Sequence, residues 1–209
     1  FGQLTARLLL AKMCKLVVLA SGGGRTLANI QQHILDGKLE ASIALVIVSK
    51  ASIGAIDRCK ELQLPYLIIG PQSHPDVELR NKLILGAIFE ARADLVILAG
   101  WLQLLPIPPE LDFKVLNIHP ALLPTYGGKG FYGHHVHQAV KDAGDLVTGC
   151  TVHFASAEYD RGTIVLQTAV QLQADDTTDD IASKVFAAEL IAYPQAINLV
   201  LDGEYGFSA

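Results

Sequence analysis

Charged residues are scarce in this sequence. Asp, Glu, Lys and Arg make up 18% of its 209 residues, the formal net charge is −5, and Lys and Arg form no cluster. Proteins that bind nucleic acid use a basic patch to neutralise phosphates. We therefore expect no nucleic-acid partner.

Cysteine is also rare. Cys14, Cys59 and Cys150 are odd in number, lie far apart and form no C-x-x-C motif. This spacing disfavours a disulfide framework and indicates reduced thiols, which leads us to expect a cytoplasmic protein. The simplest interpretation of the three side chains is that they are small buried apolar groups.

No apolar run is long enough for a membrane span or a signal peptide. The apolar stretch 8–11 is bracketed closely by Arg7 and Lys12, and no clear small-residue cleavage site follows it. We expect no membrane partner. We expect residues 1–13 to be an N-terminal extension and residues 14–209 to form one domain, because no Pro- or Ser-rich linker divides them.

Two familiar nucleotide-binding motifs are missing. An apolar run at 15–20 is followed by the sequence SGGGRT at 21–26, but Leu27 stands where G-x-G-x-x-G needs its third glycine, and no Gly-Lys-Ser/Thr is present. A helical pattern begins directly afterwards, and backbone N–H groups at a helix start favour an anion. The loop therefore predicts a phosphate-monoester site, with a plain tight turn as the alternative.

Apolar residues make up 51% of the chain, which favours a sheet covered on both faces. Strand-like and helix-like patterns alternate along the sequence, which is typical of a parallel sheet. The predicted fold is α/β, a Rossmann-like, mostly parallel central sheet with helices on both faces. The patterns give strands at 15–20, 43–48, 65–69, 94–98, 113–118, 147–154 and 162–172, and helices at 27–35, 52–62, 77–91, from 134 and 181–201.

Two polar side chains stand out at the end of one predicted strand. Asn117 and His119 lie on one face of the strand, because alternate residues share a face. Pro120 then ends the strand, since proline donates no ladder hydrogen bond. An amide can stabilise an oxyanion and an imidazole can move a proton. A buried Asn and His that bond nearby backbone are the alternative.

Other segments leave their roles open. The three histidines within 134–137 open a predicted helix and have no clustered partner ligands, so we expect no metal. Residues 126–133 hold four glycines and form either a loop that closes over a site or a surface turn. Trp101 either lines a pocket or packs under a loop. Glu189 is either a surface residue or a ligand for an amine.

Two further polar residues lie in or near the predicted strands at 147–154 and 162–172. We expect His153 to make an interior hydrogen bond. Asp160 lies in the connection between these strands, where it is typical of an Asx turn. Residues 174–180 are acidic and precede the last helix, whose dipole they would stabilise.

Several stretches, in this order, resemble the folate-dependent glycinamide ribonucleotide formyltransferases of the formyltransferase superfamily. The resemblance implies transfer of a formyl group from 10-formyltetrahydrofolate, a co-substrate, to the amine of glycinamide ribonucleotide in de novo purine biosynthesis. It covers nearly the whole chain from residue 15. The matching stretches are KLVVLASGGGRT at 15–26, AGWLQLL at 99–105, LNIHPALLP at 116–124, GCTVHF at 149–154, YDRG at 159–162 and ELIAYP at 189–194.

By this resemblance Asn117, His119 and Asp160 are the catalytic residues. The oxyanion formed when the amine attacks the formyl carbon needs a donor, which Asn117 and a protonated His119 would supply. A carboxylate favours an imidazolium, so Asp160 is expected to raise the pKa of His119. The group that relays the proton from the amine to the folate is left unassigned.

The resemblance also implies binding roles, small-molecule substrates, no metal and a monomer or homodimer. Arg25 departs from the usual Ser but adds a charge suited to phosphate, and Gln103 replaces an Arg found in some relatives. The implied ligands are Gly24, Arg25 and Thr26 for the substrate phosphate, Glu189 and Pro120 for its amine or ribose, and Leu102, Gln103, Leu104 and Asn117 for the folate.

Three other classes of protein share part of this pattern. A formyltetrahydrofolate deformylase has a similar trio but an additional N-terminal domain, which residues 1–13 are too short to form. A methionyl-tRNA formyltransferase is expected to be more basic and to have a C-terminal RNA-binding domain. A silent folate- or nucleotide-binding module would not require Asn117, His119 and Asp160 together.

Overall fold

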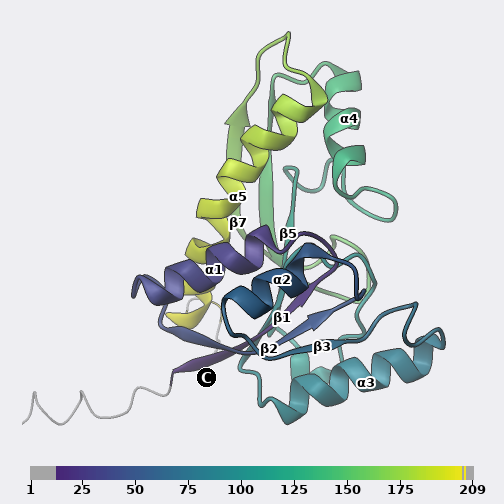
Figure 1. Ribbon diagram of the computed structural model, residues 1–209. Coiled ribbons are helices and arrows are strands. Elements are labelled where there is room, and N and C mark those ends of the chain that lie inside the picture. Colours follow the sequence, from purple (N-terminus) through teal and green to yellow (C-terminus); the bar gives the residue numbers. More distant parts are fainter. Residues whose placement is uncertain (1–12, 204, 206–209) are drawn as a thin grey trace, which may run out of the picture.

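The computed structural model describes residues 13–203 and residue 205, which form one seven-stranded sheet with its helices (Figure 1). The strand order is β3-β2-β1-β4-β5-β6-β7. Strands β1 to β5 pair in parallel, whereas β6 and β7 extend the sheet in antiparallel fashion. The strands are β1 Cys14–Ala20, β2 Ala41–Val48, β3 Tyr66–Ile68, β4 Leu95–Leu98, β5 Val115–His119, β6 Val147–Phe154 and β7 Ile164–Gln171.

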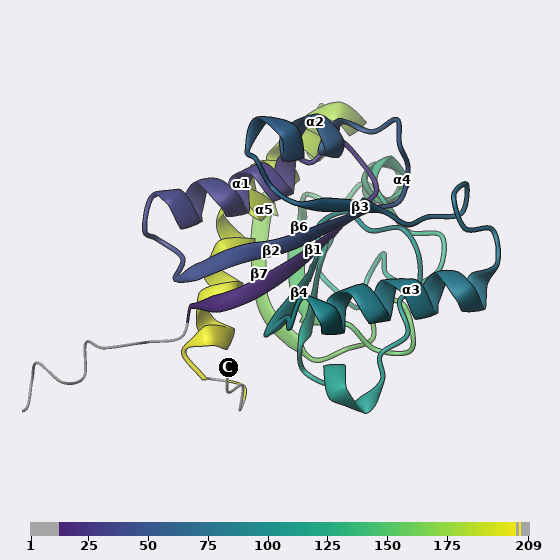
Figure 2. The same cartoon turned by 60° about the horizontal axis from the view of Figure 1, so that its bottom comes forward.

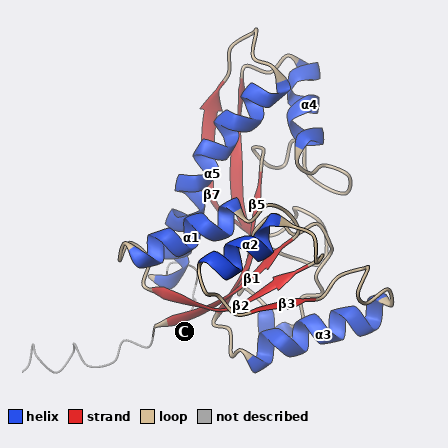
Figure 3. Cartoon of the chain, viewed as in Figure 1, coloured by secondary structure: helices blue, strands red, loops and turns tan. Residues whose placement is uncertain are grey.

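Helices cover both faces of this sheet, so the predicted α/β fold is confirmed. Alternate residues of β1 face opposite ways: Leu16 and Val18 pack with α1, α2 and α5, while Val17 and Leu19 pack with α3. Figure 2 shows α3 on the side of the sheet opposite α1 and α2, and Figure 3 distinguishes strands from helices. The helices are α1 Arg25–Leu35, α2 Gly54–Glu61, α3 Val77–Glu90, α4 His134–Ala143 and α5 Thr178–Leu201, with a short 3-10 helix at Pro109–Leu111.

The start of α5 differs from the predicted position by three residues. Thr177 accepts a hydrogen bond from the backbone N–H of Asp180, and the Asp180 side chain accepts one from the N–H of Thr177. This capping box satisfies two donors that a helix start otherwise leaves unpaired, and it begins the helix earlier than the apolar pattern indicates. Further along α5, the buried Tyr193 hydroxyl donates to the carbonyl oxygens of Leu98 and Leu116, which ties the helix to β4 and β5.

The strand order places three chain segments at one edge of the sheet. From β1 the chain moves outward to β2 and β3, then returns to the other side of β1 with β4 and β5. The carboxyl ends of β1, β4 and β5 therefore meet where the strand order reverses, and this is where open α/β sheets bind ligands. The glycine loop follows β1, Gly100 follows β4, and Asn117 and His119 lie at the end of β5.

Within the described residues, no helix combines the length and the apolar character needed to cross a membrane. The extension predicted for residues 1–13 lies outside the described residues apart from Met13.

Candidate active site

A pocket of about 720 Å³ opens along the carboxyl ends of β1, β4 and β5. It is closed on one side by α5 and on another by the segment that leads into α4. Most of the predicted site residues line it, although they come from segments far apart in the sequence. Those that do are Gly24, Arg25, Thr26, Leu102, Asn117, His119, Pro120, Asp160 and Glu189.

The glycine loop forms one wall of this pocket. Gly24 has a φ of +74°, and a Cβ atom built on it would lie 2.8 Å from the Cα of Ala55. Glycine is therefore required there on two grounds, a left-handed backbone and close packing against α2. Among the described residues no side chain caps the start of α1. The first N–H groups of α1 are thus available to an anion, as the sequence predicts for a phosphate site.

Arg25, the first residue of α1, carries a positive charge into the same wall. Its guanidinium carbon lies 3.8 Å from the centre of the Phe186 ring on α5, a cation–π contact. No carboxylate of the described residues forms an ion pair with it. The Arg25 charge therefore remains available to a ligand. The contact with Phe186 joins residues 161 positions apart and had no signal in the sequence.

Glu189 lies one helical turn beyond Phe186 and also lines the pocket. It is half-buried, and no hydrogen bond or ion pair to its carboxylate is found in the described part of the chain. Burial raises the pKa of Glu189 to about 7, and the nearby charge of Arg25 opposes that rise. Glu189 is thus a pocket residue, and a carboxylate without a protein partner in a pocket is suited to bind an amine.

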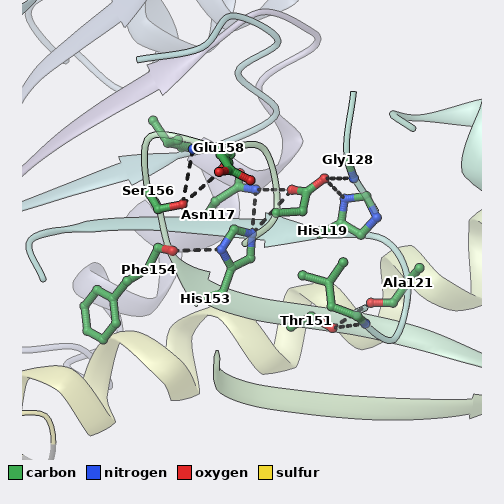
Figure 4. A network of polar contacts seen from close by, with 12 residues as sticks. Asn117, His119, Ala121, Gly128, Thr151, His153, Phe154, Ser156 and Glu158 are labelled. Carbon is green, nitrogen blue, oxygen red and sulfur yellow. Dashed lines mark hydrogen bonds and ion pairs between the residues drawn. The ribbon is translucent and has the colours of Figure 1, made fainter. Parts of the chain in front are cut away.

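Asn117, His119 and Asp160 converge in the same pocket. His119 Nδ1 lies 3.5 Å from one Asp160 oxygen, and the amide nitrogen of Asn117 lies 3.5 Å from the other. The backbone N–H of Gly128 donates to Asp160 at 2.9 Å (Figure 4). His119 and Asp160 are largely shielded from solvent, with side-chain exposures of 4% and 9%. Asp160 is therefore a member of a buried polar cluster and more than a turn residue.

Asp160 adopts a φ of +56°, which non-glycine residues rarely adopt but Asp tolerates. Gly162, two residues later, makes this sharp connection possible. A Cβ atom on Gly162 would lie 1.7 Å from the carbonyl oxygen of Phe154, so only glycine fits there. The Asp-x-Gly spacing thus has a local physical cause.

His153 belongs to the cluster as well, and the sequence did not reveal this. It is buried on β6 and makes the predicted interior hydrogen bond, from Nδ1 to the carbonyl of Phe154 at 2.9 Å. Its Nε2 is then free to accept from the Asn117 amide nitrogen at 3.1 Å (Figure 4). Because β5 and β6 pair with Asn117 opposite His153, the histidine orients the Asn117 amide.

The charges within the cluster follow from burial and neighbours. Burial is the largest influence on the pKa of His119 and lowers it; the Asp160 charge and the hydrogen bond to the Tyr126 carbonyl raise it by less. The expected rise of the His119 pKa is therefore wrong for the free protein, although Asp160 acts in the expected direction. Burial likewise raises the pKa of Asp160, but the neighbouring imidazoles of His153 and His119 and the hydrogen bond from Gly128 outweigh it and hold that pKa below its usual value.

Two of the predicted folate ligands lie just outside the main pocket. Gln103 and Leu104 line a small adjoining hollow of about 50 Å³ that also touches Asn117 and Asp160. Leu102 and Leu104 are exposed apolar side chains with 53% and 43% exposure. Trp101 is buried and packs in the core beside α3, and part of it borders both hollows. The prediction that Trp101 lines a pocket is thus confirmed, and the rest of its ring is part of the core.

The histidines at the start of α4 form no metal site. No group of three or more His, Cys, Asp or Glu in the described residues could hold a metal ion. His134 is exposed and lies 3.2 Å from Asp179. His137 is buried at the pocket wall, where burial and then the charges of His134 and His119 lower its pKa to about 4. It is therefore a neutral imidazole near neutral pH.

Comparison with known proteins agrees with this geometry. A family model described as formyl transferase matches residues 14–197, and the chain therefore belongs to that family. It is 34% identical, over 90% of its length, to a chloroplastic protein of Arabidopsis thaliana named phosphoribosylglycinamide formyltransferase. The chain spans 65% of the length of that relative.

Solved structures show the same fold. Glycinamide ribonucleotide transformylase 1 from Symbiobacterium toebii matches with a TM-score of 0.85 and 31% identity, over 93% of this chain and 90% of that one. A formyltetrahydrofolate deformylase from Pseudomonas syringae matches with a TM-score of 0.82 and 23% identity, over 92% of this chain and 62% of that one. The deformylase thus shares the fold alone.

Proposed function

We propose that the chain transfers the formyl group of 10-formyltetrahydrofolate to the amine of glycinamide ribonucleotide, a step of de novo purine biosynthesis. The products would be formylglycinamide ribonucleotide and tetrahydrofolate. The observation that carries the proposal is that Asn117, His119 and Asp160 share a pocket with an uncapped helix start and the unpaired Glu189. The formyl transferase family and the named relatives support the same reaction.

In this proposal the ribonucleotide spans the pocket. Its phosphate binds the N–H groups at Gly24 and Thr26 and the guanidinium of Arg25, because all three favour an anion. Glu189 binds the amine, and Pro120 packs against the ribose. The unpaired carboxylate of Glu189 supports its role, since a half-buried carboxylate without a protein donor can accept a hydrogen bond from the neutral amine.

The folate would enter from the side of β4. Its ring system would pack on Leu102 and Leu104 and contact Gln103, with the formyl group directed toward Asn117. Exposed leucines next to the polar cluster support this placement, since they offer apolar surface beside the reacting groups. The reaction itself requires no metal in this scheme, as the formyl carbon is already an activated acyl group.

The chemistry forms a bond from the amine nitrogen to the formyl carbon and breaks the bond from that carbon to N10 of the folate. One proton passes from the amine to N10. Asn117 donates to the oxyanion, because its contact with Asp160 at 3.5 Å is long enough to be exchanged for a stronger one. His119 donates from Nε2 to Tyr126, so its Nδ1 can take up the proton, and Asp160 stabilises the resulting imidazolium.

We also propose that residues 14–209 form one catalytic domain, supported by the continuous sheet from β1 to β7. A reducing cytoplasmic location is supported by Cys59 and Cys150, which are buried and form no disulfide among the described residues. We propose that the chain is a monomer or homodimer with small-molecule substrates only.

The proposal is tested by single-turnover transfer in the wild type and in His119→Ala. We expect transfer to fall about 10²- to 10⁴-fold in the variant, while calorimetry shows that glycinamide ribonucleotide still binds. His135→Ala is the control, because His135 is exposed and does not line the pocket. Wild-type transfer in His119→Ala, or no transfer in the wild type, would exclude the proposed role.

A further inference from the structure

The ring of His119 is held from outside the pocket. Its Nε2 donates to the backbone carbonyl of Tyr126 at 2.7 Å. With that proton fixed on Nε2, the neutral ring has its lone pair on Nδ1, the nitrogen that faces Asp160. The position of the Tyr126 carbonyl therefore decides which nitrogen of His119 can accept a proton.

The backbone at Tyr126 is in an unusual conformation. Its φ is +54°, a left-handed value that bulky residues rarely adopt. Such a conformation persists only where the surroundings enforce it. The conformation also turns the carbonyl toward His119, so the groups that hold Tyr126 in place act indirectly on the imidazole.

The Tyr126 side chain is held by Asp145 at the protein surface. The phenol hydroxyl donates to the Asp145 carboxylate at 2.6 Å, and this hydrogen bond is the first cause of a Tyr126 pKa raised to about 12. The ring also packs against the core and meets the ring of Phe131 edge-on at 6.3 Å. Asp145 lies in the turn between α4 and β6, and neither residue lines the pocket.

The same short segment also holds the second catalytic group. Two residues after Tyr126, the N–H of Gly128 donates to the Asp160 oxygen that faces His119. The two contacts therefore fix the His119–Asp160 pair through one stretch of backbone. Upstream, Leu123 is anchored on β6 by a hydrogen bond from its N–H to Thr151. Three residues after Leu123, the hydrogen bond from the Tyr126 phenol to Asp145 provides a second anchor for this segment.

We propose that Asp145, through the Tyr126 hydroxyl, is a remote positioning residue that sets the tautomer of His119. The inference rests on the proposed function only in taking His119 as the catalytic imidazole. Without the anchor, the Tyr126 backbone relaxes from its left-handed conformation and its carbonyl leaves Nε2. The proton can then move to Nδ1, where it pairs with Asp160, and the ring no longer accepts the proton of the amine at that atom.

The test combines kinetics with nitrogen-15 NMR of the histidine rings in the full chain. We expect Asp145→Ala and Tyr126→Phe each to lower kcat about tenfold to hundredfold, with the KM for glycinamide ribonucleotide unchanged. The double variant should be no worse than either single variant, because both remove the same hydrogen bond. The NMR signals should show protonated Nε2 in the wild type and a shift toward protonated Nδ1 in the variants.

Two further variants keep the test decisive. Asp145→Asn retains a hydrogen-bond acceptor and should restore most of the lost kcat. Asp142→Ala, near the end of α4, removes a surface carboxylate that, among the described residues, accepts a hydrogen bond from Gln138 alone, and it should leave kcat and tautomer unchanged. An unchanged His119 tautomer in Asp145→Ala would overturn the inference, whatever the activity, because the NMR reading does not depend on the reaction. A raised KM with an unchanged kcat in Asp145→Ala would overturn the inference as well.

Discussion

The glycine loop and the polar cluster around Asp160 line one pocket but are built differently. The loop is a single run, residues 21–26, and it offers mainly backbone N–H groups held by the start of α1. The cluster joins side chains from β5, β6 and the connection after β6, up to 43 residues apart. A backbone site depends on the conformation of a few glycines, whereas a side-chain site depends on strand register and on burial.

This difference gives the two regions different sensitivities. Substitutions in the cluster should lower kcat with little effect on binding, because its members act on the reacting atoms. Substitutions in the loop should raise KM for the phosphorylated substrate and leave chemistry largely unchanged, since the phosphate does not react.

The largest effect is expected for Asp160→Asn. The amide keeps the shape but loses the charge that stabilises protonated His119, so kcat should fall about 10²- to 10⁴-fold. KM for glycinamide ribonucleotide should stay near the wild-type value. Asp179→Asn is the matched control, because Asp179 also pairs with a histidine, His134, but lies on the surface. Comparable losses in both variants would contradict a special role of Asp160.

Glu189→Gln should have the next largest effect. The neutral amide binds the substrate amine less well, and kcat/KM should fall roughly 10- to 100-fold. In the wild type kcat/KM should rise with pH through about 7, where Glu189 ionises, and the variant should lose this dependence. A pH profile of kcat/KM checks both. An unchanged profile in the variant would assign the titration to another group.

The same substitution has an opposite effect on stability. Because the folded pKa of Glu189 is raised, its favourable contribution to folding is fully present below the ordinary Glu pKa and is lost as pH rises toward about 7. At pH 8 the Gln variant should therefore be more stable than the wild type, by on the order of 1 to 3 kcal/mol. Denaturant unfolding at pH 4 and pH 8 measures this. Equal stability of the two proteins at pH 8 would contradict it.

In the loop, Gly24→Ala should cost about 1 to 2 kcal/mol of stability and raise KM severalfold. The methyl group meets the backbone of Ala55, which cannot move aside easily, and the left-handed φ disfavours any side chain. Gly22→Ala is the control for the unfolding measurement alone, because a Cβ there meets nothing within 4 Å and its φ is not left-handed, although Gly22 also lines the pocket. Denaturant unfolding and steady-state kinetics report the two effects. A similar loss of stability in both variants would mean that the left-handed backbone and close packing of Gly24 are not the cause.

The smallest effect is expected for Arg25→Gln. Arg25 adds one charge to a site that backbone N–H groups already form, so KM should rise about three- to tenfold with kcat unchanged. The salt dependence of KM should weaken in the variant. Arg58→Gln, which removes an exposed charge paired with Glu61, should change neither. A fall in kcat would mean that Arg25 acts on the reacting atoms. It would then contradict the division between a loop that binds and a cluster that catalyses.

The features that the sequence predicts well are local. Alternation within β5 correctly puts Asn117 and His119 together, and the run of glycines before a helical pattern correctly marks the loop. The order of strands and helices also gave the α/β fold, because each element has its own apolar period. Among the predicted strands and helices, the errors lie at the ends of elements, as at Thr177, where a capping box decides the boundary.

The features that the sequence misses depend on pairing and burial. Alternation within β6 indicates that His153 shares a face with Thr151, but only the antiparallel register sets it opposite Asn117. The pKa of His119 is decided by burial, which is a property of the assembled pocket. The stacking of Arg25 on Phe186 likewise needs α1 and α5 to be side by side.

An isotope label on the formyl group distinguishes transfer from hydrolysis. The purified protein is mixed with 10-formyltetrahydrofolate labelled with carbon-13 in the formyl group, with and without glycinamide ribonucleotide, and the label is followed by NMR. We predict that the label moves to the nitrogen of the ribonucleotide, only when the ribonucleotide is present, and that no free formate forms. Label released as formate without the ribonucleotide would contradict the proposed transfer and indicate a deformylase.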